Sequence, residues 1–372
     1  MIGCRGCGAP RTDRVLDLGS IPAADNFPPA DSAVGVTDRA YPLAMQLCPA
    51  CGLAQLAADE TIADEPRGIE PQALRDQAVA AVTAVGRAGR LSGTTVREFG
   101  SPHGGTWLPL LTDLGYRPTG GVADVVVDCF GSMHDADQRA AFVARAAGTA
   151  PDGLLLMQYH SLATIVREGQ WNSLRHGHFA YYSSTALIRL LGAVGMSART
   201  AWEFDLYGGT VLIAAQHGQH PPDAQLRRLL AAERAFGITD PAVVGRLQQA
   251  TDRHVDWLRT WLRAGAAAGR RSYAYGAASR AVAPLALAGA DRTQLIAVAD
   301  ASPAKHGRRM PGTDIPIISP DELLAAAPDR VLLTLPDLFP EVAQRFPELR
   351  GRWQVDPGPA GAGHLARTAA PG

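Results

Sequence analysis

Residues 94–105 read TTVREFGSPHGG, a β-branched segment that runs directly into a glycine-rich turn. Residues 106–115, TWLPLLTDLG, predict the helix that follows, and residues 122–130, VADVVVDCF, predict a second, strongly β-branched strand. The alternation continues with a helix, a strand, a helix and a strand over residues 135–150, 153–160, 183–195 and 208–216. Strands that alternate with helices predict an α/β fold with a doubly wound, mostly parallel, Rossmann-like sheet.

A second α/β unit is predicted from about residue 271. Residues 271–287, RSYAYGAASRAVAPLAL, have the pattern of a strand, a glycine turn and a helix. Two more strands are predicted within 294–300, where the strand ends on Asp300, and within 330–337. The turn YGAAS lacks the GxGxxG pattern, so a Rossmann-like unit without that fingerprint is expected.

At 372 residues the chain is long enough for two or three domains. The predicted parts are a cysteine-rich module, a first Rossmann-like domain that starts with a helix within 60–93, a connector of about two helices, a second Rossmann-like domain and a disordered tail. Their predicted bounds are 1–58, 59–218, 219–270, 271–356 and 357–372.

The charge and hydropathy of the chain limit its partners. With 35 basic and 36 acidic side chains, no strongly basic face is expected, and nucleic acid is therefore not expected to bind. The N-terminus lacks the apolar segment of a signal peptide, and no run of about 18 apolar residues could span a membrane. These features predict a cytoplasmic protein with a small-molecule substrate and no membrane partner.

Four of the five cysteines form two CxxC pairs, Cys4 with Cys7 and Cys48 with Cys51, and a glycine follows each pair. Thiolates two residues apart converge on one tetrahedral ion, and two such pairs complete a four-sulfur shell. A closed shell predicts a structural zinc ion that stabilises a segment too short to fold alone. Two redox dithiols or unliganded cysteines are the alternative. The fifth, Cys129, is predicted to be a small buried core residue.

The glycine-rich turn is a candidate ligand loop because it joins the end of a predicted strand to the start of a helix. A doubly wound sheet binds nucleotide-like ligands at that position, where glycine lets the backbone approach closely. The candidate cofactor-binding residues are Glu98, Gly100, Ser101 and Gly104. A purely structural turn is the alternative.

A second candidate site lies in residues 169–183, GQWNSLRHGHFAYYS. Its polar and aromatic side chains are Arg175, His176, His178, Tyr181 and Tyr182. A histidine whose pKa lies near neutral can remove a proton from a carbon next to a ketone. The alternatives are satisfied structural polar groups, or a metal site in which His176 and His178 are ligands.

Together these motifs resemble the NDP-sugar C-methyltransferases, which build branched deoxysugars of natural products. The pattern CxxCG…LDLGxxPxADNF…YPLxxxxCxxCGLxQL is similar to that family's zinc domain. RHGHFAYYS is similar to its catalytic H-x-H-x-x-Y-x-S segment, and residues 207–210, YGGT, match the strand that follows it. YGAASR, DASPAKHGRRMPGTDIPI and LLTLPD match its C-terminal nucleotide-sugar-binding domain, so the likeness covers nearly the whole chain.

The resemblance implies a class I methyltransferase domain that binds S-adenosylmethionine. The histidine that matches His178 removes the proton beside a 4-keto group, and the enolate attacks the sulfonium methyl. Tyr181 and Tyr182 are then candidates to orient the base or the sugar, and His176 is expected to orient its neighbour. The implied substrate-binding residues are Arg175, Tyr207, Tyr275, Gly276, Arg280 (lysine in the family), Asp300 and Lys305.

The chain departs from the family pattern in four places. Pro102 and His103 replace Asn-Asp in the cofactor loop, and Gly177 replaces a glutamate between the two histidines. The sequence passes from LGYRPTGG directly to ADVVVD, without the strand whose terminal acidic residue holds the cofactor ribose. The tyrosine-rich segment after the zinc domain has become EPRGIEPQAL. Two alternatives therefore stay open: a methyltransferase-fold enzyme that epimerises, isomerises or eliminates through the same enolate without S-adenosylmethionine, or a non-catalytic binding relative.

Overall fold

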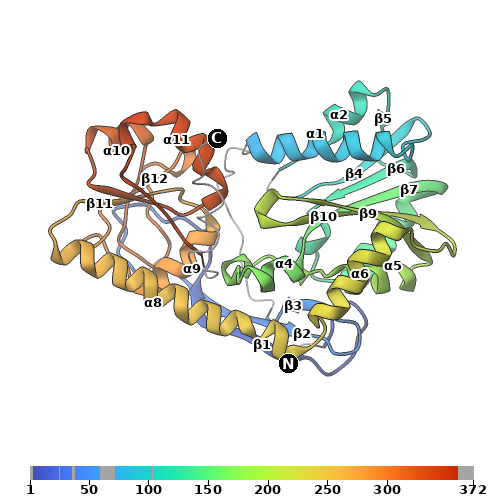
Figure 1. The fold of residues 1–372 in the computed structure, drawn as a ribbon, viewed down its shortest axis with the longest axis horizontal. Coiled ribbons are helices and arrows are strands. Elements are labelled where there is room, and N and C mark those ends of the chain that lie inside the picture. Colours follow the sequence, from blue (N-terminus) through green and yellow to red (C-terminus); the bar gives the residue numbers. More distant parts are fainter. Residues whose placement is uncertain (1–2, 25, 36–37, 59–71, 103, 359–372) are drawn as a thin grey trace.

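The computed structural model describes residues 3–24, 26–35, 38–58, 72–102 and 104–358, whose strands form three separate sheets (Figure 1). Three predictions concern residues outside these ranges: the start of the helix within 60–93, His103 of the glycine-rich turn, and all but two residues of the tail. The predicted α/β class is confirmed. Within the described residues, no helix is both long and apolar enough to cross a lipid bilayer.

The central sheet has six strands in the order β5-β4-β6-β7-β10-β9. Their bounds are β4 (Thr95–Phe99), β5 (Arg117–Pro118), β6 (Ala123–Cys129), β7 (Thr149–His160), β9 (Met196–Phe204) and β10 (Thr210–His217). Strands β4 to β7 run parallel, whereas β10 is antiparallel to both of its neighbours. Strand β9 was not predicted, because polar residues interrupt its apolar pattern on the exposed side of an edge strand.

Helices cover both faces of this sheet. Their bounds are α1 (Gln72–Arg87), α2 (Leu108–Asp113), α3 (Gln138–Gly148) and α5 (Ser184–Ala193), whereas α4 (Leu162–Arg167) packs with the N-terminal sheet. Helices α1 and α2 pack on one face with Val125 and Val127 of β6, and α3 and α5 pack on the other face with Val126. The β-branched run is therefore buried on both sides, as a central parallel strand requires. Cys129 lies in the core between the sheet and helices α1 and α2. It is 2% exposed, so the prediction of a buried cysteine is confirmed.

The sheet is short on the β5 edge. Strand β5 has only two residues, and the chain returns from Pro118 through residues 119–122 directly into β6. Within the described residues, no strand lies outside β5. The segment missing from the sequence pattern is therefore missing from the fold as well.

The N-terminal sheet has the order β1-β2-β3-β8 and is antiparallel. Its strands are β1 (Asp13–Pro22), β2 (Ala40–Leu47), β3 (Ala54–Leu56) and β8 (Ala180–Tyr181). Strand β8 follows His178 in sequence, and its Tyr181 pairs with Ala54 of β3. The cysteine-rich module therefore anchors the carboxyl end of the histidine segment, a pairing that the sequence pattern did not predict.

The C-terminal sheet is parallel, in the order β13-β12-β11-β14-β15. Its elements are β11 (Ser272–Tyr275), α9 (Ser279–Ala288), β12 (Val298–Ala299), β13 (Ile317–Ile318), α10 (Pro320–Ala325), β14 (Arg330–Leu333), α11 (Phe339–Arg345) and β15 (Trp353–Val355). Three helices form the connector: α6 (Ala224–Phe236), α7 (Pro241–Val244) and α8 (Arg246–Ala267). Helix α8 runs beneath the C-terminal lobe and also contacts β1 (Figure 1).

The described residues also form six short 3-10 helices. They are η1 (Ser132–His134), η2 (Trp171–Ser173), η3 (Leu206–Gly208), η4 (Pro303–Lys305), η5 (Pro336–Leu338) and η6 (Pro347–Leu349). The first three lie in loops at the carboxyl end of the central sheet or beside it, and they position the side chains described below.

Candidate active site and zinc site

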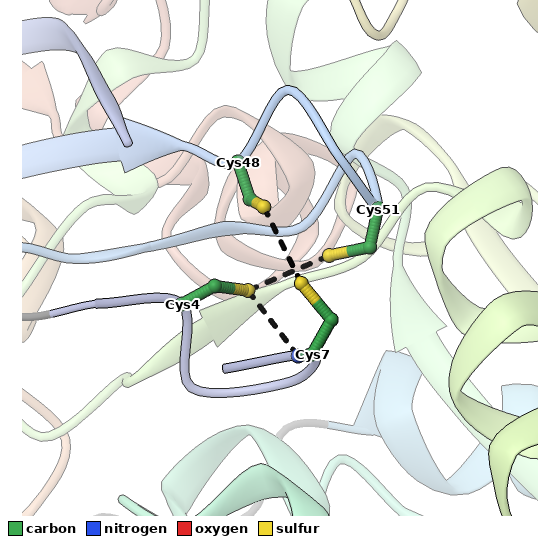
Figure 2. A group of neighbouring side chains, drawn as sticks. All are labelled: Cys4, Cys7, Cys48 and Cys51. Carbon is green, nitrogen blue, oxygen red and sulfur yellow. Dashed lines mark hydrogen bonds between the residues drawn. The ribbon is translucent and has the colours of Figure 1, made fainter. Parts of the chain in front are cut away.

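The four cysteines of the CxxC pairs converge on one point (Figure 2). The Sγ atoms of Cys4 and Cys51 lie 3.5 Å apart, those of Cys7 and Cys48 lie 3.6 Å apart, and all four lie within 4.8 Å of one another. A tetrahedral zinc ion with Zn–S bonds of about 2.3 Å places its sulfurs about 3.8 Å apart. The donor set and its spacing therefore fit zinc.

A glycine turn follows each CxxC pair and shapes the backbone around the sulfurs. Gly8 and Gly52, which follow the two pairs, have φ angles of +76° and +78° and donate to the carbonyls of Cys4 and Cys48 at 2.9 and 2.8 Å. A hydrogen bond from Cys51 lowers the pKa of Cys4 to about 5, and the same bond raises the pKa of Cys51. Four thiolates this close repel one another, so a shared cation would favour their ionised form.

The zinc module supports the histidine segment. Arg5, inside the first CxxC pair, lies over the ring of Phe179 at 4.9 Å and donates to the carbonyl of Leu56. The backbone N–H of Phe179 donates to Met133 at 2.7 Å, and its carbonyl accepts from Leu56 at 3.2 Å. The residue next to His178 is therefore held by the zinc module on one side and by η1 on the other.

His178 is 7% exposed, and Arg175 and His134 contact its ring. Arg175 Nε lies 2.8 Å from His178 Nε2, and the ring of His134 meets that of His178 edge-on at 4.6 Å. The Nδ1 atom of His134 lies 3.1 Å from the carbonyl oxygen of Gly177, whose φ of +77° allows the tight turn. The sequence pattern did not point to His134, although this residue follows a predicted strand by a few residues.

The other predicted residues of this segment lie in different surroundings. His176 is 4% exposed and contacts the ring of Tyr41 in the N-terminal sheet. The hydroxyl of Tyr181 accepts the backbone N–H of Arg175 at 3.1 Å, so it fixes the loop. Tyr182 donates to Gln138 and packs in the core, where burial raises its pKa. Tyr182 therefore has a packing role in this structure rather than contact with the base.

A metal site at the histidines is not supported. Among the described residues, the four zinc-module cysteines are the one group of three or more potential ligands close enough to share an ion. Within the part of the chain that the structure describes, the alternative in which His176 and His178 bind a metal therefore lacks a third ligand.

A buried ion pair sets the position of η1. Asp128, at the end of β6, accepts the backbone N–H groups of Gly131 at 2.7 Å and Ser132 at 3.1 Å, and Arg145 Nε lies 2.5 Å from it. Because η1 carries Met133 and His134, this pair indirectly orients the histidine turn. Sequence reasoning missed it, since Asp128 and Arg145 are joined only through the packing of α3 on the sheet.

On the other side of the site, β7 ends at His160. Arg280, from the start of α9, lies with Nη2 3.4 Å from His160 Nδ1 and with its guanidinium 5.0 Å from the ring centre of Tyr207. Burial, and then the charge of Arg280, lower the pKa of His160 to about 3, so this imidazole is neutral. Burial and the charge of Arg175 lower the pKa of Arg280, which shows that the two guanidinium groups influence each other.

The YGGT motif is explained by close packing. A Cβ atom on Gly208 would lie 2.5 Å from Nε2 of Gln170, and one on Gly209 would lie 2.4 Å from Oγ1 of Thr164. Tyr207 itself has a φ of +56°, which is unusual for a residue with a side chain. The two glycines therefore let η3 approach α4 closely and hold Tyr207 beside Arg280.

The glycine-rich loop fits one half of S-adenosylmethionine. Gly104 has a φ of +94°, and a Cβ atom on Gly100 or Gly104 would meet no atom of the described residues within 4 Å, so these residues leave the backbone open to a ligand. The carboxylate of Glu98 accepts from Thr106 Oγ1 at 2.5 Å and from the backbone N–H of Trp107 at 2.6 Å. Glu98 therefore braces the loop rather than projecting from it.

The residues after β5 do not fit the ribose half of S-adenosylmethionine. The chain after β5 reads Thr119-Gly120-Gly121, so no carboxylate stands at the carboxyl end of this strand. The hydroxyl of Thr119 already accepts the N–H of Gly121 at 3.1 Å. The described residues thus offer an open loop but no acidic partner for the ribose hydroxyls of the cofactor.

Among the predicted residues of the C-terminal domain, all except Arg280 shape a loop. Asp300 accepts the N–H of Ala277 at 2.8 Å, and Lys305 donates to the carbonyl of the same residue at 2.8 Å. A Cβ atom on Gly276 would lie 2.7 Å from Oγ1 of Thr334. Tyr275 packs against Phe346 and Trp353. This loop lies at the carboxyl end of β11, between strands β12 and β14, where open parallel sheets bind nucleotides.

The fold and these two sites define a zinc-containing α/β enzyme of the methyltransferase class. The family described as "Putative zinc binding domain" matches residues 4–62, and that described as "C-methyltransferase C-terminal domain" matches residues 205–354. The C-methyltransferase NovU of Streptomyces niveus is 27% identical over 404 aligned positions, covering 95% of this chain and 94% of the relative. The chain is therefore similar to C-methyltransferases over nearly its whole length.

Solved structures resemble only part of the chain. The magnesium protoporphyrin IX methyltransferase of Synechocystis is 14% identical and covers 39% of this chain and 83% of its own, with a TM-score of 0.29. The mitomycin 7-O-methyltransferase MmcR is 15% identical and covers 39% of this chain and 56% of its own, with a TM-score of 0.30.

Proposed function

We propose that the protein C-methylates the carbon next to the ketone of a 4-keto NDP-deoxysugar, and that His178 is the base that forms the enolate. The observation that carries this proposal is the turn of residues 175–178. It holds a nearly buried imidazole between His134 and Arg175, at the side of the central sheet that Arg280 of the C-terminal domain also approaches. A positioned imidazole in such surroundings is suited to general base catalysis.

The chemistry needs little more than a base at the right place. A proton on a carbon beside a ketone is acidic because the charge left behind spreads onto the ketone oxygen. His178 takes this proton, the electrons of the C–H bond form a carbon–carbon double bond, and the oxygen gains the negative charge. The carbon of this enolate is then the nucleophile for C-methylation.

The C-terminal domain is suited to hold the nucleotide diphosphate. Arg280 lies at the start of α9, where the family has lysine, and the loop of Gly276 and Ala277 precedes it. Asp300 and Lys305 fix this loop through both backbone groups of Ala277. A diphosphate bound here would place the attached sugar toward Tyr207, His160 and the histidine turn.

The missing ribose partner favours a second candidate function. S-adenosylmethionine, when bound, supplies an electrophilic methyl group, and the open backbone at Gly100 and Gly104 leaves room for it. Leaving the ribose hydroxyls without an acidic partner costs about 1–3 kcal/mol for each unpaired group. If the cofactor does not bind, the same enolate can be reprotonated or can expel a neighbouring group, which makes the enzyme an epimerase, isomerase or eliminase.

The experiment is an exchange reaction in deuterated water. The protein is incubated with 4-keto NDP-deoxysugars, in their thymidine and uridine diphosphate forms, with and without S-adenosylmethionine. We expect deuterium at the carbon beside the ketone without the cofactor, and a product heavier by one methyl group with it. Exchange without methylation selects the second candidate, and the absence of exchange on both substrates contradicts both.

A further inference from the structure

The guanidinium of Arg175 and the imidazole of His178 are held side by side by one turn. The backbone N–H of His178 donates to the carbonyl of Arg175 at 3.4 Å, and Gly177 between them has a φ of +77°. The hydroxyl of Tyr181 accepts the backbone N–H of Arg175 at 3.1 Å and donates to the carbonyl of Ser173 at 3.3 Å. The contact of 2.8 Å between Arg175 Nε and His178 Nε2 is therefore built into the loop.

Arg175 and Arg280 bring two positive charges to the site. Within the described part of the chain, the ion pairs involve neither Arg175 nor Arg280. Both side chains are only partly exposed, and each lies near the positive charge of the other. The charge of Asp337 partly offsets that of Arg280, whereas no ion pair of the described residues involves Arg175. Partly buried cations are unfavourable unless negative charge lies near them, so their positions indicate two places for negative charge on a ligand.

The two positions differ in chemistry. Arg280 stands at the first turn of α9 beside the nucleotide-binding loop, which suits the permanent charge of a diphosphate. Arg175 stands next to the base, close to where negative charge develops during the reaction. An enolisation needs its base and its hydrogen-bond donor next to one another, because the proton leaves one carbon and the charge arrives at the oxygen of the adjacent carbon.

We propose that Arg175 is a catalytic residue, whose guanidinium hydrogen-bonds the ketone oxygen of the substrate and stabilises the enolate. This inference rests on the proposed function. The ketone oxygen replaces His178 Nε2 as the acceptor of Arg175, which frees that nitrogen for the proton. The C–H bond breaks, the proton passes to His178, and the oxygen receives the charge beside a cation with up to five donors. Donors preorganised in this way act mainly on the transition state.

The test separates catalysis from binding. The variants are Arg175→Gln, which keeps an N–H donor but removes the charge, Arg175→Lys, which keeps the charge, and Arg280→Gln as a matched control. Two quantities are measured: the rate of deuterium exchange at saturating 4-keto NDP-deoxysugar, and the affinity for the nucleoside diphosphate alone by calorimetry. Unfolding temperature and zinc content confirm that each variant is folded.

We expect Arg175→Gln to slow saturated exchange by about 10²–10³-fold, the usual effect of losing one oxyanion donor, with nucleoside diphosphate affinity within about twofold of the parent. Arg175→Lys should retain part of the rate. Arg280→Gln should weaken nucleoside diphosphate binding at least about tenfold with a smaller effect on saturated exchange.

Two results would overturn the inference while leaving the proposed function intact. One is full-rate exchange in Arg175→Gln. The other is a loss of diphosphate affinity in Arg175→Gln equal to that in Arg280→Gln with unchanged saturated exchange, which would make Arg175 a binding group. If the parent protein itself exchanges no deuterium, the proposed function fails and this role of Arg175 fails with it.

Discussion

His254 Nε2 lies 2.7 Å from Asp356 Oδ1, in a buried pair that joins the connector helix α8 to the chain just after β15. The indole N–H of Trp171 donates to the other ring nitrogen, Nδ1, at 3.2 Å. His254 Nε2 therefore carries the proton of the neutral imidazole. This chain of hydrogen bonds ties η2, which leads into the turn of Arg175 and His178, to the C-terminal lobe.

Replacing His254 should weaken this connection strongly. The variant His254→Phe leaves the carboxylate of Asp356 and the N–H of Trp171 buried without their partners, which should lower the free energy of unfolding by about 2–4 kcal/mol. Asp356→Asn is the matched control, because it keeps an acceptor for His254 and should cost about 1 kcal/mol. Guanidinium unfolding measures both. If the free energy of unfolding fell by the same small amount in both variants, the prediction would be contradicted.

Metal analysis should find about one zinc ion per chain, bound by the four cysteines of the two CxxC pairs. The variant Cys48→Ser should lose the ion and become unstable or aggregate, since the N-terminal module depends on it. Cys129→Ala is the control, because that thiol lies outside the cluster and its loss should leave the zinc content unchanged. A fully zinc-free parent with unchanged thermal stability would disprove the structural role.

His160 should make the fold sensitive to acid. Its folded pKa of about 3 lies below the ordinary value of 6.5, so between these pH values the unfolded chain binds more protons and stability falls as the pH falls. This histidine should account for a loss of roughly 3 kcal/mol between pH 7 and pH 4. The variant His160→Gln should therefore lose less stability over this range than the parent. His220→Gln, at an exposed position, should behave like the parent in the same denaturant titrations.

The sequence predicted best what depends on local spacing. The two CxxC pairs and their glycines define a zinc site before any fold is known, and the β-branched run of β6 already requires a buried strand. The partners of His178 could be predicted only in part. Arg175 is three residues away and was a candidate, whereas His134 reaches the turn through η1 and the buried pair of Asp128 with Arg145.

His160 and strand β8 were not predicted, because both depend on contacts between residues far apart in the sequence. His160 was not predicted because Arg280, which contacts it, lies 120 residues later in another domain. Strand β8 pairs with the N-terminal sheet although its residues lie in the central part of the sequence. Domain bounds drawn from the sequence pattern therefore assign it to the central domain. Such contacts follow from how domains pack, and no local periodicity records them.

Restoring the missing ribose partner should strengthen cofactor binding. Thr119 is the first residue after the edge strand β5, and the hydrogen bond that its hydroxyl accepts from Gly121 is local. We expect the parent to bind S-adenosylmethionine more weakly than micromolar, and Thr119→Asp to improve the affinity about tenfold, the equivalent of one charged hydrogen bond. Thr119→Asn is the neutral control and should change little.

The outcome of this titration also decides between the two candidate functions. Micromolar binding by the parent, unaffected by Thr119→Asp, would show that other groups hold the ribose. No heat of binding from any of the three proteins at millimolar cofactor would leave enolisation without methyl transfer as the function. Gly104→Val should abolish any binding observed, because a side chain there fills the space through which a ligand approaches the loop.

The role of His178 is common to methylation, epimerisation and elimination, because each begins with loss of the same proton. His178→Ala should slow deuterium exchange by about 10²–10⁴-fold, the usual contribution of a positioned base. Imidazole added to the buffer should restore part of the rate, since the alanine leaves space for it beside Arg175. His176→Ala is the matched control: its ring contacts Tyr41 rather than Arg175, so it should reduce stability more than saturated exchange. Exchange at the parent rate in His178→Ala would remove the assignment of this residue as the base.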